Sequence, residues 1–315
     1  MSEIRYASLK HDLTRNLGDE IQTIASDRFI PAIDRRFERD QLATVEDKTP
    51  YLIVLNGWFS HSPDTTFPLA DCLFPVITGF HIAEKAWGHI AQDATLEFLS
   101  KYAPIGCRDR RTAEMLSMKG IDVYYSKCVT LTLPKRSQAP VNGKIFVVDA
   151  QEVLLPKRMR KNTVYVTHRP VPGQDRLKQA LALLDRYRDE ASLVVTRRLH
   201  CALPCVAMGI PVIFLSDKKD YRVSVAGDVG LRIYRIDPFR LPRGIRGLVR
   251  LFGWNKYWDR FNPYLLRLYH YVIEQINWDP EPIDFEEEKA EMIRTLKDCI
   301  QQARDILSGS VHTKE

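Results

Sequence analysis

Short apolar runs alternate with amphipathic stretches along the first two thirds of the chain. The apolar runs predict buried strands at residues 4–9, 51–55, 74–79, 105–107, 123–125, 144–149, 163–167 and 231–234. Helical patterns begin after Asn16 and cover residues 95–101, 111–119 and 175–188. On the last of these helices, Leu177, Leu181 and Leu184 share one face. This alternation predicts an α/β protein with parallel sheets and right-handed crossovers.

The composition changes to Pro, Lys, Ser, Gln and Asn at residues 133–143, which indicates a linker. We therefore expect two Rossmann-like domains that face a cleft, at residues 1–137 and 138–238. Residues 239–315 should form a basic aromatic segment followed by C-terminal helices at 263–276 and 284–307. On the last helix an apolar stripe is expected to pack against the domains; it consists of Met292, Leu296, Cys299, Ala303 and Ile306.

The overall composition is that of a globular protein that works in a reducing compartment. Of the 315 residues, 45% are hydrophobic and 27% charged, and no apolar run is long enough to span a bilayer. The first residues lack the pattern of a secretion signal, and the six cysteines form no CxxC pair, so we expect a cytoplasmic protein without a zinc site. The net charge of +6 suits anionic substrates. No recognisable nucleic-acid-binding module is present, so nucleic acid is not an expected partner.

The segment at residues 239–260 is rich in basic and aromatic residues. Six Lys or Arg residues alternate with Leu, Phe, Trp and Tyr, and Asp259 is the only acidic residue. Such a stretch suits the inner face of an anionic membrane, and it would also suit the stacking of sugars or a flexible nucleic-acid groove. It equally suits a solvated basic face over ordinary core aromatics. These interpretations stay open at this point.

The segment at residues 194–215 carries the clearest chemistry. It reads as a buried strand, a basic turn, a short helix ended by Gly209, and a second buried strand. The turn contains Arg197, Arg198 and His200. Ligands of open α/β sheets bind at the carboxyl ends of strands, and a helix start favours anions. Arginines bind phosphate or carboxylate in bidentate fashion, and histidine carries a proton near neutral pH. We therefore predict an acid–base site for an anionic substrate.

Other predicted strands also end in polar residues. Arg108 follows the strand at 105–107, and Asp109 is expected to cap the next helix. His168 and Arg169 close the strand at 163–167. Asp19 lies at the start of the first helix, where it either accepts a proton or caps the helix.

Three pieces of this sequence together resemble the polysaccharide pyruvyltransferase family. They are Asn16-Leu17-Gly18-Asp19-Glu20, then Cys107-Arg108-Asp109-Arg110-Arg111-Thr112, and then Thr196-Arg197-Arg198-Leu199-His200 followed by Ala207-Met208-Gly209-Ile210-Pro211. The resemblance covers roughly residues 16–235. Where the family often has a glycine-rich stretch, this chain has Asn56-Gly57-Trp58-Phe59.

The resemblance implies a two-domain fold similar to GT-B glycosyltransferases, with the acceptor on the N-terminal domain and the donor on the C-terminal domain. It implies transfer of the pyruvyl group of phosphoenolpyruvate to a saccharide, free or lipid-linked, as a cyclic ketal. No cofactor or metal is expected, because arginines can carry the charge. His200 would be the general acid that protonates the donor, and Asp19 the second catalytic residue. The expected donor-binding residues are Arg198, Arg197, Arg108, His168 and Arg169, and no acceptor-binding residue is assigned.

Two other functions fit the same sequence. One is a nucleotide-sugar glycosyltransferase on a GT-B fold, which would need a nucleotide site in the C-terminal domain. The other is a non-catalytic protein that uses residues 239–260 to bring a glycan-assembly complex to the membrane.

Overall fold

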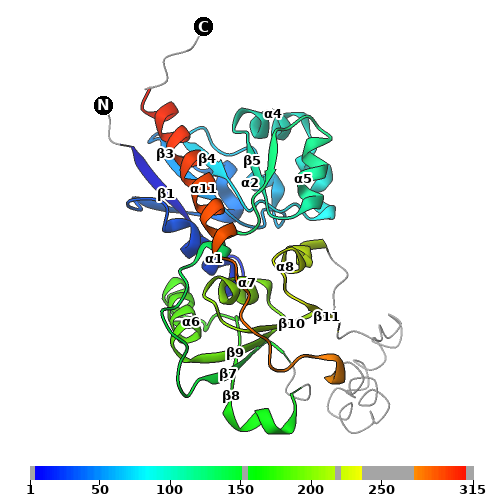
Figure 1. Ribbon diagram of the computed structural model, residues 1–315. Helices are drawn as coiled ribbons and strands as arrows, with labels where there is room; N and C mark the ends of the chain where they lie inside the picture. Colours follow the sequence, from blue (N-terminus) through cyan, green and yellow to red (C-terminus); the bar gives the residue numbers. More distant parts are fainter. Residues whose placement is uncertain (1–3, 151–154, 217–220, 236–272, 310–315) are drawn as a thin grey trace, which may run out of the picture.

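The computed structural model describes residues 4–150, 155–216, 221–235 and 273–309. These residues form two α/β halves, each built on parallel strands, and one half lies above the other in Figure 1. The sheet of the N-terminal half has the order β2-β1-β3-β4, and a small β5-β6 sheet adjoins it through a bridge between Phe80 and Cys107. The sheet of the C-terminal half has the order β11-β10-β9-β7-β8. The strands are β1 (Arg5–Lys10), β2 (Arg35–Glu38), β3 (Tyr51–Leu55), β4 (Leu73–Ile77), β5 (Ile105–Cys107), β6 (Val123–Tyr125), β7 (Lys144–Val148), β8 (Thr163–Val166), β9 (Ala191–Thr196), β10 (Val212–Ser216) and β11 (Ile233–Arg235).

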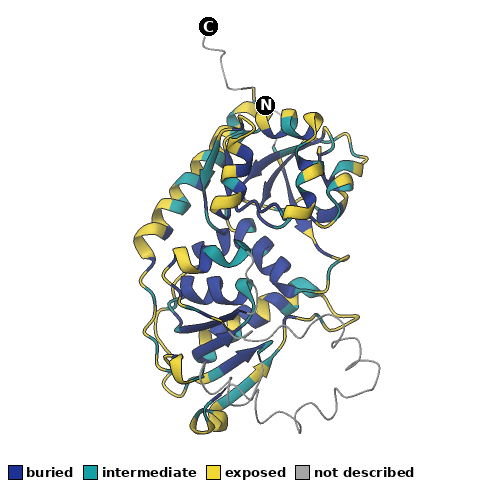
Figure 2. Cartoon of the chain, turned by 90° about the vertical axis from the view of Figure 1, so that its right-hand side faces the viewer, coloured by how far each residue is buried: buried dark blue, intermediate teal, exposed yellow. Residues whose placement is uncertain are grey.

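Every strand pair in these sheets is parallel, which confirms the expected fold class. Strands β3 and β10 are buried along their whole length, as Figure 2 shows, because helices cover both faces of a parallel sheet. The α-helices are α1 (Leu17–Asp27), α2 (Pro63–Thr66), α3 (Trp87–Ile90), α4 (Asp93–Lys101), α5 (Arg110–Ser117), α6 (Arg176–Glu190), α7 (Leu199–Ala207), α8 (Ser224–Asp228) and α11 (Glu286–Leu307). The 3₁₀ helices are η1 (Arg39–Thr44), η2 (Glu84–Ala86), η3 (Val129–Thr132), η5 (Lys157–Asn162) and η6 (Tyr221–Val223).

Strand β2 was not predicted from the sequence. Its sequence, Arg-Arg-Phe-Glu, has no apolar run, and it pairs with β1 at the edge of the sheet. Tertiary contacts hold it there: Arg36 donates to Asp27 at 2.8 Å and to the Ser8 hydroxyl at 2.8 Å. An edge strand fixed by polar contacts leaves little trace in the hydrophobic pattern.

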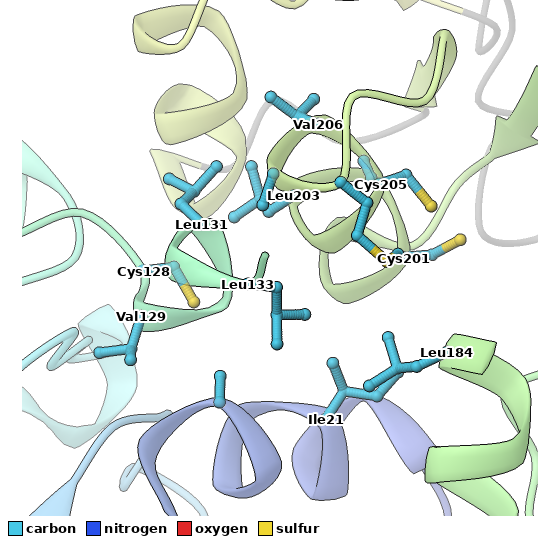
Figure 3. Close-up of a cluster of buried hydrophobic side chains, with 14 of the residues drawn as sticks. Ile21, Cys128, Val129, Leu131, Leu133, Leu184, Cys201, Leu203, Cys205 and Val206 are labelled. Atoms are coloured by element: carbon cyan, nitrogen blue, oxygen red, sulfur yellow. The ribbon is translucent and has the colours of Figure 1, made fainter. Parts of the chain in front are cut away.

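One cluster of buried hydrophobic side chains spans both halves, and each half also has a cluster of its own. Helix α1 of the N-terminal half packs against α6 and α7 of the C-terminal half. Figure 3 shows Ile21 of α1 near Leu184 of α6, with Cys201 of α7 and Leu133 nearby. The backbone N–H of Leu17 also donates to the carbonyl of His168 at 2.7 Å. The helix that carries the first family motif is therefore fixed directly against the opposite half.

The expected linker is a loop between η3 and β7, and it includes the boundary proposed between residues 137 and 138. Helix α11 then returns to the N-terminal half, where it packs against η3, β3 and β4 (Figure 1). Its buried Lys289 donates to the carbonyl of Ala207, at the end of α7, at 2.7 Å. The expected C-terminal helix is thus confirmed, and it contacts both halves.

Two predicted helix faces need correction. On α6 the buried residues are Ala180, Leu183, Leu184 and Tyr187, whereas Leu181 is 42% exposed. The buried residues follow the helical i, i+3, i+4, i+7 spacing. The predicted buried face of α6 was therefore displaced by about one position along the helix. On α11, Ile306 is 65% exposed. The basic aromatic segment 239–260 and most of the helix expected at 263–276 lie outside the described residues.

Candidate active site

A cavity of about 690 Å³ lies between the two halves, at the carboxyl ends of their strands. It receives residues that follow β1, β3 and β5 on one side and β8, β9 and β10 on the other, as expected for ligand sites in parallel sheets. The lining residues are Leu13, Thr14, Arg15, Asn16, Asp19, Trp58, His61, Arg108, His168, Arg197, Arg198, Leu199, His200, Ser216, Arg222 and Val223. The predicted basic turn therefore faces the space between the halves.

The start of helix α7 forms one wall of this cavity. Its N-cap residue is Arg198, and no side chain caps the helix. Asn16, by contrast, caps α1 by accepting from the Gly18 N–H at 3.1 Å. An uncapped helix start presents N–H groups and a positive dipole end to a ligand. Arg198 and the start of α7 together suit an anion.

Arg108 reaches the same cavity from the N-terminal half. Its side chain is 2% exposed, and one terminal nitrogen lies 3.4 Å from His200 Nε2 and 3.4 Å from Gln22 Oε1. Its Nε has no hydrogen-bond partner, and within the described ranges no carboxylate lies within 4.0 Å of the guanidinium. A buried charge without a counter-charge costs free energy. An anionic group next to Arg108 would offset this cost.

His200 lies between Arg108 and the start of α7. It is half-buried, with φ −82° and ψ 21° inside the first turn. Burial, and next the charge of Arg108, lower the pKa of His200 well below its ordinary value. The imidazole is therefore neutral near pH 7, and its Nε2 accepts from Arg108. Helix α1 passes so close that a Cβ on Gly18 would lie 3.1 Å from the Cβ of His200, which explains the glycine in the first motif.

Arg198 is held by a carboxylate that the sequence reasoning missed. Its Nε donates to Asp149 Oδ2 at 2.7 Å, and Asp149 follows β7 with a φ of 50°. Asp149 also accepts from the His168 N–H at 3.0 Å and from the Thr167 hydroxyl at 2.7 Å. Burial alone would raise the pKa of Asp149, but these hydrogen bonds and Arg198 lower it below its ordinary value. An acidic residue at the carboxyl end of the strand predicted at 144–149 was the available signal.

The other predicted donor residues are distributed unevenly. His168 lines the cavity, is fully buried and lies 3.0 Å from the Tyr187 hydroxyl through Nε2. Arg197 lines the cavity as well. Arg169 is exposed and is not among the lining residues. The structure therefore brings Arg108, Arg197, Arg198, His168 and His200 together and leaves Arg169 apart.

Asp19 lines the cavity but does not cap its helix. Asn16 is the cap of α1, so the capping alternative for Asp19 is wrong. Its Oδ1 accepts from Gln22 Nε2 at 3.4 Å, and its Oδ2 lies 3.6 Å from the buried guanidinium of Arg39. These contacts hold the carboxylate at the cavity wall, and its catalytic role stays a prediction.

Asp109 does cap its helix, as expected. Its Oδ1 accepts from the Thr112 N–H at 2.8 Å, and its Oδ2 lies 2.6 Å from His81 Nδ1. Burial and the charge of Arg108 lower the pKa of His81 to about 4, so the neutral ring donates through Nδ1 to the carboxylate. The His81–Asp109 pair is fully buried and fixes the loop that carries Arg108.

Within the described part of the chain, no three His, Cys, Asp or Glu residues are grouped so that they could hold a metal ion. None of the helices described in the structure combines the length and apolar character that a bilayer crossing requires.

Solved structures resemble this chain only weakly. A putative UDP-N-acetylglucosamine 2-epimerase from Listeria monocytogenes aligns with 100% of this chain and 99% of its own, at 12% identity and a TM-score of 0.40. Another structure described as UDP-N-acetylglucosamine 2-epimerase aligns with 94% of this chain and 96% of its own, at 11% identity and a TM-score of 0.42. Likeness at this level supports no argument about the site.

Sequence families are more informative. No curated protein matches the chain. The family model described as polysaccharide pyruvyl transferase matches residues 16–220, which is more than half of the chain and includes all three motifs. The chain therefore belongs to the polysaccharide pyruvyl transferase family.

Proposed function

We propose that this protein transfers the pyruvyl group of phosphoenolpyruvate to two hydroxyl groups of a saccharide, as a cyclic ketal. The observation that carries the proposal is Arg108, whose buried guanidinium has no carboxylate within 4.0 Å among the described residues and lies 3.4 Å from His200 in the cavity between the halves. Phosphoenolpyruvate carries two anionic groups on three carbons. It matches a site with two separate positive regions around an acid–base residue.

The two positive regions suggest how the donor binds. The start of α7 and Arg198 would hold the phosphate, because an uncapped helix start and a guanidinium both favour this group. Arg108 would hold the carboxylate. Arg197 and His168 line the same side of the cavity and would complete the donor site. Arg169 would act only at the rim, since it lies outside the lining.

The donor itself can supply the charge that His200 needs. In the free protein His200 is neutral, because burial and Arg108 lower its pKa. A bound donor with its negative charges favours the imidazolium form and neutralises Arg108. His200 then holds a proton next to the methylene carbon of the donor, as a general acid requires.

The reaction that we propose balances without any further reactant. His200 gives its proton to the methylene carbon, which becomes the methyl group, while C2 becomes electrophilic. One sugar hydroxyl attacks C2, the C2–oxygen bond to phosphate breaks, and a second hydroxyl attacks C2 to close the ketal. The two hydroxyl protons end on the methyl group, through His200, and on inorganic phosphate. Asp19, which lines the cavity at the N-terminal wall, would accept a hydroxyl proton on its way to the phosphate.

A donor screen tests this function. The protein is incubated with phosphoenolpyruvate and a panel of sugars, and phosphate release is measured together with the mass of the sugar product. We expect release that depends on one class of sugar and a product that carries a pyruvate ketal. Parallel reactions contain nucleotide sugars in place of phosphoenolpyruvate. Turnover of a nucleotide sugar without any turnover of phosphoenolpyruvate would replace the proposal with a glycosyltransferase.

The cellular setting is part of the same proposal. We expect the reaction in the cytoplasm, and a lipid-linked acceptor would bring the protein to the inner face of the membrane. This membrane contact depends on residues 239–260, which lie outside the described part of the structure.

A further inference from the structure

The cavity is larger than the proposed donor requires. Its volume of about 690 Å³ is in the range of pockets that hold ligands far larger than a three-carbon acid phosphate. The groups assigned to the donor lie around α7 and Arg108. The rest of the cavity has a different wall, which no part of the donor chemistry uses.

This second wall is built around one aromatic ring. Trp58 follows β3, lines the cavity and lies beside His61, with 5.3 Å between the ring centroids. Two cations lie over the indole: Lys85 Nζ is 5.8 Å and Arg222 Cζ is 5.3 Å from its centroid. Trp58 belongs to the N-terminal half and Arg222 to the C-terminal half, so the surface spans the mouth between them. We call it the Trp58 wall; it consists of Trp58, His61 and Arg222, which line the cavity, and of Lys85, which lies over the indole outside the lining.

Two groups of the Trp58 wall lack a polar partner among the residues that the structure describes. The indole Nε1 is buried and has no hydrogen-bond partner among the residues that the structure describes. Lys85 is exposed, and over the same part of the chain no carboxylate lies within 4.0 Å of its ammonium group. An aromatic ring with cations over it contacts the apolar face or edge of a sugar and leaves positive charge for an anionic group.

We propose that the Trp58 wall is the acceptor subsite and that the acceptor is an acidic saccharide, which carries a phosphate or carboxylate group within reach of Lys85 and Arg222. The sugar ring contacts Trp58 and His61, and its anionic group lies at the rim of the cavity. Its hydroxyl groups then point inward, toward the donor at Arg108 and His200. This inference rests on the proposed function for the order of donor and acceptor, but the binding site itself can be tested alone.

Binding without donor is the first experiment. Dissociation constants are measured by calorimetry for galactose 1-phosphate, galacturonate and galactose in the absence of phosphoenolpyruvate. We expect at least one acidic sugar to bind about tenfold or more tightly than galactose, since a charge-assisted contact is gained. The two acids differ in their anionic group, so their comparison separates a phosphate from a carboxylate acceptor. Equal binding of galactose and both acids, or no binding of any of them, overturns the inference.

Variants locate the binding. Lys85→Gln should weaken binding of the acidic sugar about tenfold and leave galactose unaffected. Lys101→Gln is the matched control, because Lys101 Nζ lies 5.2 Å from the Tyr102 ring, outside the cavity lining, in a second exposed cation–aromatic pair. If Lys85→Gln and Lys101→Gln behave alike, the subsite is not at the Trp58 wall. In turnover, Lys85→Gln should raise the acceptor KM and leave the KM for phosphoenolpyruvate unchanged.

The two proposals fail in different ways. Acidic-sugar binding that depends on Lys85, without phosphate release from phosphoenolpyruvate, supports the subsite and overturns the proposed function. Phosphate release with a neutral sugar, at a rate insensitive to Lys85→Gln, supports the function and overturns the subsite.

Discussion

Helices α5 and α7 both begin where a parallel strand ends, but their first turns are built differently. Asp109 caps α5 and also accepts from His81, so its helix start is closed by a buried carboxylate. Arg198 stands at the same position of α7, and no side chain caps that helix. In the first arrangement, a carboxylate of the protein itself accepts a hydrogen bond from the start of the helix. The second leaves the first N–H groups of α7 without a side-chain cap, and it is the one that faces the cavity.

Arg108 directly precedes Asp109 in the chain and lies 3.4 Å from His200, so it lies next to both helix starts. Its replacement gives the largest expected loss of activity. Arg108→Met should lower kcat/KM for phosphoenolpyruvate by about 1,000-fold, because a positioned charge in the site is lost. Its melting temperature should be equal to or above that of the wild type, since a buried charge without a counter-charge is removed. Phosphate release and thermal unfolding measure the two effects. A variant that keeps more than a tenth of the activity contradicts the proposed donor site.

His200 is the proposed acid–base group in the first turn of α7. His200→Gln should lower kcat by about 100-fold or more, because glutamine cannot deliver a proton. The KM for phosphoenolpyruvate should change little, since Arg108 and Arg198 still hold the donor. Steady-state phosphate release measures both constants, and circular dichroism checks the fold. A large rise in KM with an unchanged kcat would assign His200 to binding instead.

Asp109 tests the closed helix start. Asp109→Asn should destabilise the protein by about 2 kcal/mol, through a weaker cap and the lost partner of His81. The net pKa of Asp109 in the folded protein is below its ordinary value, so its contribution is present above that value and is lost as the pH falls through the folded pKa. Urea unfolding at neutral and acidic pH should therefore show a difference from the wild type that shrinks on acidification. An equal difference at every pH would speak against a stabilising role of the ionised Asp109 carboxylate.

Arg198 tests whether the open helix start can be closed. Arg198→Ser introduces a residue that caps helices well, so unfolding should occur at the same or a higher temperature. The lost pair with Asp149 is partly exposed and contributes little to stability. The KM for phosphoenolpyruvate should rise about tenfold, because one charged contact is removed. If the stability falls and the KM stays unchanged, Arg198 serves the fold and not the donor.

Proton uptake on donor binding is the smallest of the expected effects, but it identifies the residue that takes up the proton. His200 is neutral in the free protein near pH 7, and donor binding should raise its pKa, so binding should take up a proton fraction of up to about one. Calorimetric titrations with phosphoenolpyruvate in buffers of different ionisation enthalpy measure this fraction. His200→Gln should abolish the uptake, while His61→Gln should not. Uptake that persists in His200→Gln would place the proton on another group.

Much of this organisation was predictable from local sequence. The apolar runs and their spacing predicted the parallel α/β halves, because central strands such as β3 and β10 are buried on both faces. The ends of those strands located Arg108, Arg198 and His200, since parallel sheets collect ligand groups at their carboxyl edge. Asp109 as a cap follows from its own side chain and the next three residues.

Other features depend on residues far apart in the chain. Arg108 and His200 are 92 positions apart, and only the packing of α1 against α6 and α7 brings them to 3.4 Å. The same packing lowers the pKa of His200, because burial and a neighbouring charge are properties of the folded site. Strand β2, the Asp149–Arg198 pair and the Trp58 wall likewise combine segments that carry no local signal of one another. The sequence by itself thus determined the elements and the chemical groups at their ends, whereas the tertiary structure decided which groups meet.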